Sequence, residues 1–486
     1  MDIEEARDIL GKAGQSHVLA FWDRLDDAGR AHLLAQVSEI DFAAVERLRG
    51  ALLSALAETG GAGAPPAAGD MEPAPVAELS GPERAAAFAR GEEELRAGRV
   101  GALLVAGGQG TRLGFDGPKG CFPIGPGSGE SLFFFHARKL LAKKRRYGRP
   151  VPLYVMTSAA NDAATRDFFR KRRFFGLDEE DVFFFRQAMW PALSPDGKMI
   201  LEKPDSVFLS PDGHGGVLSA LERSGALADM EARGLSTVFH FQVDNPMPDV
   251  AAPDAVGFHL LEGADATLEA FERTGPDEKM GMPVLRGGRT AIVEYTEFGE
   301  DRMHERAPDG SLRYRWGAPS PFLFSVPFLR REAEAGLPIH LAHKKVPFAD
   351  ASGETVKPDA PNAYKFEKFV FDALADARCV RCLARDRREE YSPVKNAEGD
   401  KSPRSVELDL SAKWERWLDQ DPWWKDWIDR QNSFGFFVND VEIDPMFADS
   451  AEEVRHVTLS GSAGFVLGAW QGGTLVLTER FRGGCV

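Results

Sequence analysis

The hydrophobic pattern divides the chain into a helical start and a long stretch in which apolar runs alternate with helical patterns. In residues 1–58, apolar side chains recur at helical spacing. From about residue 101 to 385, short apolar runs have the length of strands, and segments with helical spacing separate many of them. The predicted strands are 101–106, 151–157, 181–186, 236–243, 266–272 and 290–295. The predicted helices are 81–97, 131–144, 161–174 and 254–262. This alternation predicts an α/β domain whose largely parallel sheet is covered on both faces.

Three segments outside this alternation suggest where domains begin and end. Residues 60–77 (GGAGAPPAAGDMEPAPVA) are rich in Gly, Pro and Ala, and we predict a linker without packed helix or strand. Residues 414–430 (WERWLDQDPWWKDWIDR) predict a tryptophan-rich pair of helices, with Pro422 at the start of the second. Residues 456–480 predict short strands joined by glycine turns. We therefore predict a helical N-terminal region, a central α/β domain and a small α+β C-terminal domain, bounded as 1–97, 98–388 and 389–486.

Helix ends give further local predictions. Asn362 can cap a helix whose apolar face consists of Phe366, Phe369, Val370, Ala373 and Leu374. The basic clusters 143–146 and 170–173 end predicted helices, where cations suit the helix dipole. We expect the side chains of both clusters to be solvated.

Composition excludes several classes of protein. The net charge of the 486 residues is 59 − 75 = −16, which argues against nucleic-acid binding. The apolar runs fall well short of the roughly 18–20 residues of a membrane span, and the acidic start MDIEEARDIL is unlike a signal peptide. Cys379 and Cys382 form a CxxC without a second pair, so we expect packing residues in a reducing cytoplasm and no zinc site.

The strongest candidate for chemistry is GGQGTRLGFDGPKG, residues 107–120, which follows the first predicted strand. Its spacing fits neither the dinucleotide fingerprint GxGxxG nor the P-loop GxxxxGK[ST]. A run of small residues can instead present backbone amides to an anion, and Arg112 and Lys119 add positive charge. The residues alone therefore predict a site for nucleotide phosphates, with a tight structural turn as the alternative.

The whole stretch LLVAGGQGTRLGFDGPKG resembles the signature of sugar nucleotidyltransferases, AGGxGTRL followed by Pro-Lys. Its glutamine form is similar to the eukaryotic-type UTP–sugar-1-phosphate uridylyltransferases, closest to those that act on N-acetylglucosamine. The resemblance implies a nucleotide-diphospho-sugar-transferase-like (Rossmann-like) α/β fold, Mg²⁺ as cofactor, and UTP and a sugar 1-phosphate as substrates. It also implies catalytic roles for Arg112, Lys119 and Lys395, the last within SPVKN. The nucleotide-binding residues that it implies here are Ala106, Gly107, Gly108, Gln109, Gly110 and Thr111.

Further motifs follow in the family's order. By resemblance, Gln187 and Gly213 lie against the uracil ring, and His214 is a further nucleotide-binding residue. Asp244 ends an apolar strand in VDN, where an open α/β sheet binds ligands, and is the candidate metal ligand. Glu294, Asn245 and Gly281 are implied sugar-binding residues. Several positions also have an interpretation without the family. His214 fits a loop histidine, and Asp244 and Asn245 fit turn residues. Glu294 fits an outward glutamate of an alternating strand, and Lys395 fits a solvated lysine.

Two positions depart from the family's pattern and bear on the sugar. The N-acetylglucosamine enzymes usually have Asn in DGNGG, where this chain has His214, and glucose-type relatives often carry His there. An Asn-His pair expected before SVPFL is replaced by a segment that contains Pro321. We predict uridylyl transfer from UTP to a hexose 1-phosphate, with release of pyrophosphate and N-acetylglucosamine 1-phosphate favoured. The alternative substrates are glucose 1-phosphate and galactose 1-phosphate. The alternative classes of protein are a non-catalytic UDP-sugar-binding protein and an NAD-dependent oxidoreductase, although the glycine-rich loop lacks the spacing that the latter requires. The sequence gives no oligomeric state.

Overall fold

The computed structural model describes residues 1–59, 71–433, 438–459, 465–471 and 474–479. Contacts between residues divide the chain into two compact units. The first unit combines Met1–Gly69 with Gln187–Ala220 and Glu332–Ala373, and the rest of the chain forms the second unit. Each unit thus gathers segments from different parts of the sequence, whereas the three predicted regions are consecutive.

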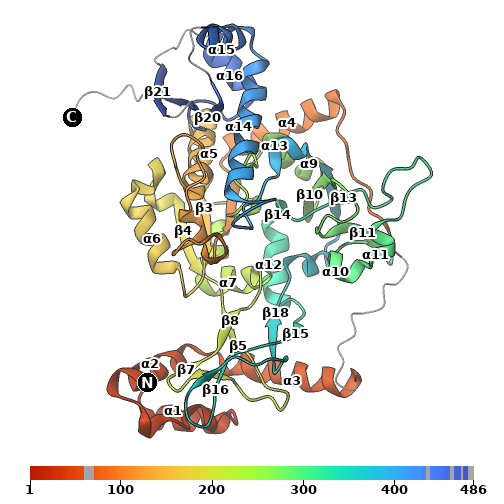
Figure 1. Ribbon diagram of the computed structural model, residues 1–486. Coiled ribbons are helices and arrows are strands. Elements are labelled where there is room, and N and C mark those ends of the chain that lie inside the picture. Colours follow the sequence, from red (N-terminus) through yellow and green to blue (C-terminus); the bar gives the residue numbers. More distant parts are fainter. Residues whose placement is uncertain (60–70, 434–437, 460–464, 472–473, 480–486) are drawn as a thin grey trace. The chain divides into compact units, whose positions relative to one another are not determined.

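The second unit is built on an eight-stranded sheet (Figure 1). Its order across the sheet is β13 (Trp316–Gly317), β10 (Ala266–Glu272), β14 (Phe322–Ser325), β9 (Thr237–Gln242), β2 (Val100–Val105), β3 (Leu153–Thr157) and β4 (Val182–Arg186), with β19 (Val380–Ala384) also paired to β10. β2 is parallel to both β3 and β9, and β3 is parallel to β4, whereas β14 is antiparallel to its neighbours. The prediction of a mixed, largely parallel sheet is confirmed. Because β2 and β9 are adjacent and parallel, the loops after both strands leave the same edge of the sheet.

The helices of this unit match the predicted helical segments. They include α4 (Gly81–Arg96), α5 (Leu132–Tyr147), α6 (Asp162–Lys171) and α9 (Pro253–Leu261). α4 and α9 touch backbone to backbone through glycines. A Cβ at Gly91 would lie 1.8 Å from the Pro253 carbonyl oxygen, and one at Gly257 would lie 1.7 Å from that of Ala87. Only glycine permits an approach this close.

The tryptophan-rich helix pair is confirmed as α14 (Pro403–Asp419) and α15 (Pro422–Ser433), and Pro422 begins the second helix. Trp414, Trp417 and Trp424 are buried in the core of the second unit. β20 (Asp440–Ile443), β21 (Phe465–Gln471) and β22 (Thr474–Glu479) form a three-stranded sheet, which confirms strands over the last two ranges. The start of the predicted strand region, 456–459, is instead the end of the helix α16 (Ala451–Leu459). Residues 460–464, 472–473 and 480 lie outside the described part of the chain.

Two further predictions of local structure were wrong. Within the predicted linker, residues 60–70 lie outside the described residues, but Met71–Pro73 forms the strand β1, paired with β11 (Met282–Arg286). Hydrogen bonds from a distant strand there outweigh a local composition typical of linkers. The helix predicted after Asn362 is instead the strand β18 (Ala363–Glu367) followed by a 3₁₀ turn, because β18 pairs with β15 (His340–Lys344). Asn362 caps no helix, since its side chain bonds both the N–H and the carbonyl of Val346.

The first unit contains the N-terminal helices and short paired strands. α1 (Ile3–Lys12), α2 (Asp27–Glu39) and α3 (Phe42–Thr59) confirm the helical prediction for residues 1–58. Their apolar faces share a core with strands from the later segments of the unit, including β5 (Met189–Pro191) and β18. In the described part of the chain, no helix combines the length and the apolar character needed to cross a membrane.

Candidate active site

The glycine-rich segment forms an open loop at the carboxyl end of β2. The backbone N–H groups of Gly107, Gly108 and Gln109 donate to no group among the described residues. The Gly108 carbonyl is held in place, since it accepts from the Lys119 N–H at 3.1 Å and from Asn161 Nδ2 at 3.1 Å. Free amides on a loop that is fixed through a neighbouring carbonyl can bind an anion without further rearrangement.

The glycines of this loop fall into two kinds. A Cβ at Gly110 would lie 2.7 Å from the Phe115 ring, and one at Gly120 would lie 2.2 Å from the Phe133 ring, so packing alone requires glycine at both positions. A Cβ at Gly108 would meet no atom within 4 Å. The space beside Gly108 is therefore open to a ligand.

Lys119 and Asp244 meet at this edge of the sheet. Lys119 Nζ lies 3.1 Å from Asp244 Oδ2, and the two side chains are 17% and 13% exposed. The second carboxylate oxygen, Oδ1, accepts from no residue that the structure describes. The pair thus joins one cation and one carboxylate with a free oxygen, close to the carboxyl ends of two adjacent strands.

The other predicted residues of the loop differ in their surroundings. Arg112 is exposed and forms no ion pair with any described residue, so its charge is available to a ligand. Thr111, at the start of a 3₁₀ turn, is also exposed. Ala106 is buried and its carbonyl accepts from Asn161 Nδ2 at 2.9 Å, while Gln109 Nε2 donates to the Ala160 carbonyl at 3.1 Å.

The segment that carries Lys395 is fastened to the residues at the end of β9. The Asp244 carbonyl accepts from the Val394 N–H at 2.8 Å. Asn245 Nδ2 donates to the Glu390 carbonyl at 2.9 Å, and its Oδ1 accepts from the Ser392 N–H at 3.0 Å. The Asn245 side chain therefore holds the segment 390–392 through two hydrogen bonds and has one amide N–H left over. Lys395 follows this segment and has an exposed side chain.

Glu294 and Gly281, both predicted to contact sugar, lie side by side. A Cβ at Gly281 would lie 3.2 Å from Glu294 Oε1. Burial raises the pKa of Glu294 and the neighbouring Glu297 raises it further, whereas the positive charge of Lys395 opposes the shift. The structure thus brings Glu294, Gly281 and Lys395 into one neighbourhood.

Gln187, Gly213 and His214 belong to the first unit, and Gln187 is buried there. Gly213 has a φ of +83°, and a Cβ there would lie 2.4 Å from the Lys368 carbonyl oxygen. The His214 ring packs on Phe369 and Phe371, with centroids 5.4 Å away in both cases, and Nδ1 accepts from the Val370 N–H at 3.2 Å. Burial lowers the pKa of His214 to about 4, so the ring is neutral. Packing within its own unit accounts for a histidine at this position.

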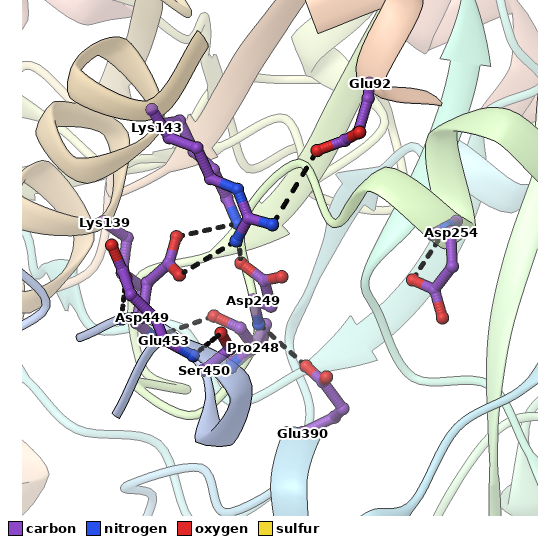
Figure 2. Close-up of polar contacts among 12 residues, drawn as sticks. Glu92, Lys139, Lys143, Pro248, Asp249, Asp254, Glu390, Asp449, Ser450 and Glu453 are labelled. Atoms are coloured by element: carbon purple, nitrogen blue, oxygen red, sulfur yellow. Dashed lines mark hydrogen bonds and ion pairs between the residues drawn. The ribbon is translucent and has the colours of Figure 1, made fainter. Parts of the chain in front are cut away.

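Sequence reasoning missed the buried polar residues behind Asp244. His136, Lys139 and Lys143 of α5 and Lys413 of α14 are buried, and all four contact the segment 243–249. Lys143 lies between Asp249 and Asp449 (Figure 2), so the prediction that 143–146 is a solvated cluster was wrong for this residue. The signal was the i, i+3, i+7 spacing of 136, 139 and 143, which puts the three side chains on one face of the helix. The second cluster is confirmed as exposed.

The donor set can be tested against a magnesium ion. No group of three or more His, Cys, Asp or Glu side chains among the described residues could hold a metal ion by itself. Magnesium, however, is often held by one or two carboxylates together with substrate phosphates. The free Oδ1 of Asp244 fits that kind of binding.

Comparisons with known proteins show which proteins this chain is similar to. The family described as UTP–glucose-1-phosphate uridylyltransferase matches residues 82–400. Human UDP-N-acetylhexosamine pyrophosphorylase-like protein 1 is 38% identical over 437 residues, which cover 85% of each chain. UDP-N-acetylglucosamine pyrophosphorylase of Saccharomyces cerevisiae is 34% identical over 341 residues, 67% of this chain and 71% of the yeast protein. The crystal structure of uridine diphosphate N-acetylglucosamine pyrophosphorylase from Trypanosoma brucei superposes with a TM-score of 0.81 at 26% identity and 98% coverage of both chains.

These similarities confirm the predicted fold, because the match extends over nearly the whole chain of a solved relative. They also confirm the resemblance seen in the loop, since the matched range contains the loop, Asp244 and Lys395. The chain belongs to the UTP–glucose-1-phosphate uridylyltransferase family.

Proposed function

We propose that this protein transfers a uridylyl group from UTP to N-acetylglucosamine 1-phosphate, producing UDP-N-acetylglucosamine and pyrophosphate. The observation that carries the proposal is the meeting of Lys119 with Asp244 beside the open amides of residues 107–109. The choice of sugar rests on relatives such as the yeast enzyme, whose name specifies UDP-N-acetylglucosamine. The proposed reaction takes place in the cytoplasm, in keeping with the free thiols of Cys121, Cys379 and Cys382.

The reaction needs no general base. A phosphate oxygen of the sugar phosphate, already an anion, forms a bond to the α-phosphorus of UTP. The bond from that phosphorus to the bridging oxygen breaks, and pyrophosphate leaves with the electron pair. Catalysis then consists of holding the two substrates in line and neutralising charge on the leaving group.

The glycine-rich loop and its two cations have different roles in this reaction. The amides of Gly107, Gly108 and Gln109 hold phosphate oxygens of UTP, and Arg112 and Lys119 balance the charge that builds up on pyrophosphate. Lys119 already lies against a carboxylate, so its charge is aimed at this edge before substrate arrives. Preorganised charge of this kind costs no rearrangement during the reaction.

Asp244 Oδ1 would hold a magnesium ion together with phosphate oxygens of the substrate. A bound magnesium ion would neutralise negative charge on the phosphates. The role of this chain is to keep that carboxylate fixed, which it does through the bond from the Val394 N–H to the Asp244 carbonyl.

The sugar and the base are assigned to other residues. Lys395 would balance charge on the reacting phosphates, while Glu294, Gly281 and the remaining Asn245 N–H would contact the sugar. Gln187 and Gly213 would lie against the uracil ring, and His214 would be a further nucleotide-binding residue. Because packing explains His214, its difference from the usual Asn does not by itself favour glucose.

The test is release of pyrophosphate from UTP with a panel of N-acetylglucosamine, N-acetylgalactosamine, glucose and galactose 1-phosphates, with and without magnesium. We expect the highest kcat/KM with N-acetylglucosamine 1-phosphate and a requirement for magnesium. A higher kcat/KM with glucose or galactose 1-phosphate would overturn the choice of sugar. Tight binding of UDP-sugars without any pyrophosphate release would show a non-catalytic binding protein instead.

A further inference from the structure

One face of α5 follows the chain segment that begins at the candidate catalytic carboxylate. His136 Nε2 lies 3.0 Å from the Val243 carbonyl oxygen, and burial lowers the pKa of His136 to about 3, so the neutral ring donates this bond. One turn later, Lys139 Nζ donates to the Pro246 carbonyl and, at 2.7 Å, to that of Pro248. The contacts of α5 therefore advance along the segment in step with the helix.

A second helix binds the same segment from the C-terminal region. Lys413 Nζ of α14 donates to the Met247 carbonyl at 2.8 Å and to the Glu389 carbonyl at 2.7 Å. The carbonyls of three successive residues, 246–248, thus accept from two buried lysine side chains. Burial, with the positive charge of Lys413, lowers the pKa of Lys139 to about 7. Lys413 also joins this segment to the stretch 389–394, which leads to Lys395.

The sequence of the segment explains why side chains must do this. Pro246 and Pro248 have no N–H, so neither residue can donate a backbone hydrogen bond that would hold this segment in place. Their buried carbonyls still need donors. Burying a lysine amino group is costly unless its hydrogen bonds are satisfied, so two such groups on one short segment indicate a position that must be held closely.

We propose that Lys139 and Lys413 are positioning residues that fix the backbone after Asp244 and thereby hold its carboxylate against Lys119. Neither lysine touches the proposed substrates; each acts through carbonyls of the segment 246–248. The inference rests on the proposed function for its catalytic consequence. Its structural part, the bracing of residues 244–249, stands apart from the reaction.

The first experiment measures kinetics of Lys139→Met and Lys413→Met, which keep an unbranched apolar stem and remove the amino group that donates to the carbonyls. We expect kcat to fall about 100-fold in each, as for a misplacement of about 1 Å, while KM for UTP changes less than about 3-fold. Lys144→Met is the matched control on the same helix, since Lys144 pairs with Asp178 and Asp181 and contacts nothing in the segment. Wild-type kcat in both folded variants would overturn the proposal.

A double-mutant cycle separates positioning from general loss of structure. In an Asp244→Asn background, we expect Lys139→Met to reduce kcat by less than about 3-fold, because the group that it positions is already altered. A merely structural role would give the same fold-loss in both backgrounds. Equal losses would therefore overturn the inference even if both variants were slow.

Hydrogen exchange gives a readout that does not depend on activity. Peptides covering 242–250 and 389–396 contain the Val394 N–H, which bonds the Asp244 carbonyl, and the Asp249 N–H, which bonds Glu390 Oε2. We expect their exchange to be at least about 10-fold faster in Lys139→Met and Lys413→Met, with other core peptides unchanged. Unchanged exchange would overturn the bracing, whereas faster exchange in a protein without pyrophosphate release would overturn the proposed function alone.

Discussion

Lys143 provides the sharpest test of how the structure around the candidate site is held together. Its Nζ lies 2.7 Å from Asp249 Oδ1 and 3.0 Å from Asp449 Oδ2, and its side chain is 2% exposed (Figure 2). Burial alone would lower the pKa of Lys143, but the two carboxylates raise it above its usual value, so the ammonium form persists. Lys143→Met keeps the length of the stem and removes the only charge that lies between these two carboxylates among the described residues.

The expected loss of stability follows from the two carboxylates, Asp249 and Asp449, that remain after the substitution. Removing one partner of a buried ion pair costs about 3–5 kcal/mol, because the other charge is left without compensation. Two features of the site favour the lower end of this range. The Asp249 side chain is 24% exposed, and Asp449 keeps Arg146 at 3.9 Å. We therefore expect Lys143→Met to lower the free energy of unfolding by about 3 kcal/mol.

A second substitution tests the cause of this loss. Asp449→Asn in the Lys143→Met background removes one uncompensated charge and is expected to restore about 1–2 kcal/mol. Urea unfolding at pH 7, followed by the fluorescence of the buried tryptophans Trp414 and Trp424, measures the free energy of unfolding. Lys144→Met, at a more exposed ion pair on the same helix, is the control and should cost less than about 1 kcal/mol. A loss below about 1 kcal/mol in Lys143→Met, or no recovery in the double variant, would refute the reasoning.

Three further predictions concern catalysis, acid stability and packing. Lys119→Met removes a preorganised cation from the phosphates and should lower kcat/KM for pyrophosphate release by about 10²–10³-fold; a change below 10-fold would count against its role. Burial lowers the pKa of His259 to about 4, so between about pH 6.5 and pH 4 the unfolded state binds this proton and the folded state does not. Stability should therefore fall by up to about 1.4 kcal/mol per pH unit from this residue between pH 6.5 and 4. In urea unfolding across that range, His259→Asn should reduce the slope and exposed His32→Asn should not. Gly257→Ala places a Cβ 1.7 Å from the Ala87 carbonyl oxygen and should lower the free energy of unfolding by about 1–3 kcal/mol, seen as a lower midpoint of urea unfolding. An unchanged midpoint would contradict the close contact of α4 with α9.

The sequence was sufficient for the parts of the fold and site in which local pattern and tertiary structure agree. Apolar runs of strand length became β2, β3, β4, β9 and β10, because a parallel sheet buries both faces of its strands. The position of Asp244 at the end of one such run predicted its place at the edge of the sheet, and the structure puts Lys119 beside it. Strand order and the antiparallel β14 could not be predicted, since the pairing partner of a strand lies far away in sequence.

The errors share one physical cause, which is that distant segments supply partners that a local pattern cannot show. Asn362 has the residue type of a helix cap, yet its amide meets the backbone of Val346. Met71 follows a linker-like stretch, yet β11 provides a strand for it to pair with. Lys143 lies in a basic run that suggests solvent, yet Asp249 and Asp449 arrive from two other parts of the chain.

The tryptophan-rich C-terminal helices belong to the candidate site through energetics as well as through Lys413. Each buried lysine amino group on the segment after Asp244 carries a desolvation cost, offset only in part by its hydrogen bonds. Burying one tryptophan removes roughly 150–250 Å² from water, which contributes about 4–6 kcal/mol. Trp414 packs on Phe135 of α5, with ring centroids 5.9 Å apart, one residue before the polar face begins at His136. The aromatic contact that joins α14 to α5 therefore stabilises the same pair of helices whose lysines must stay buried, and this explains why a tryptophan-rich helix accompanies a polar stripe behind the candidate active site.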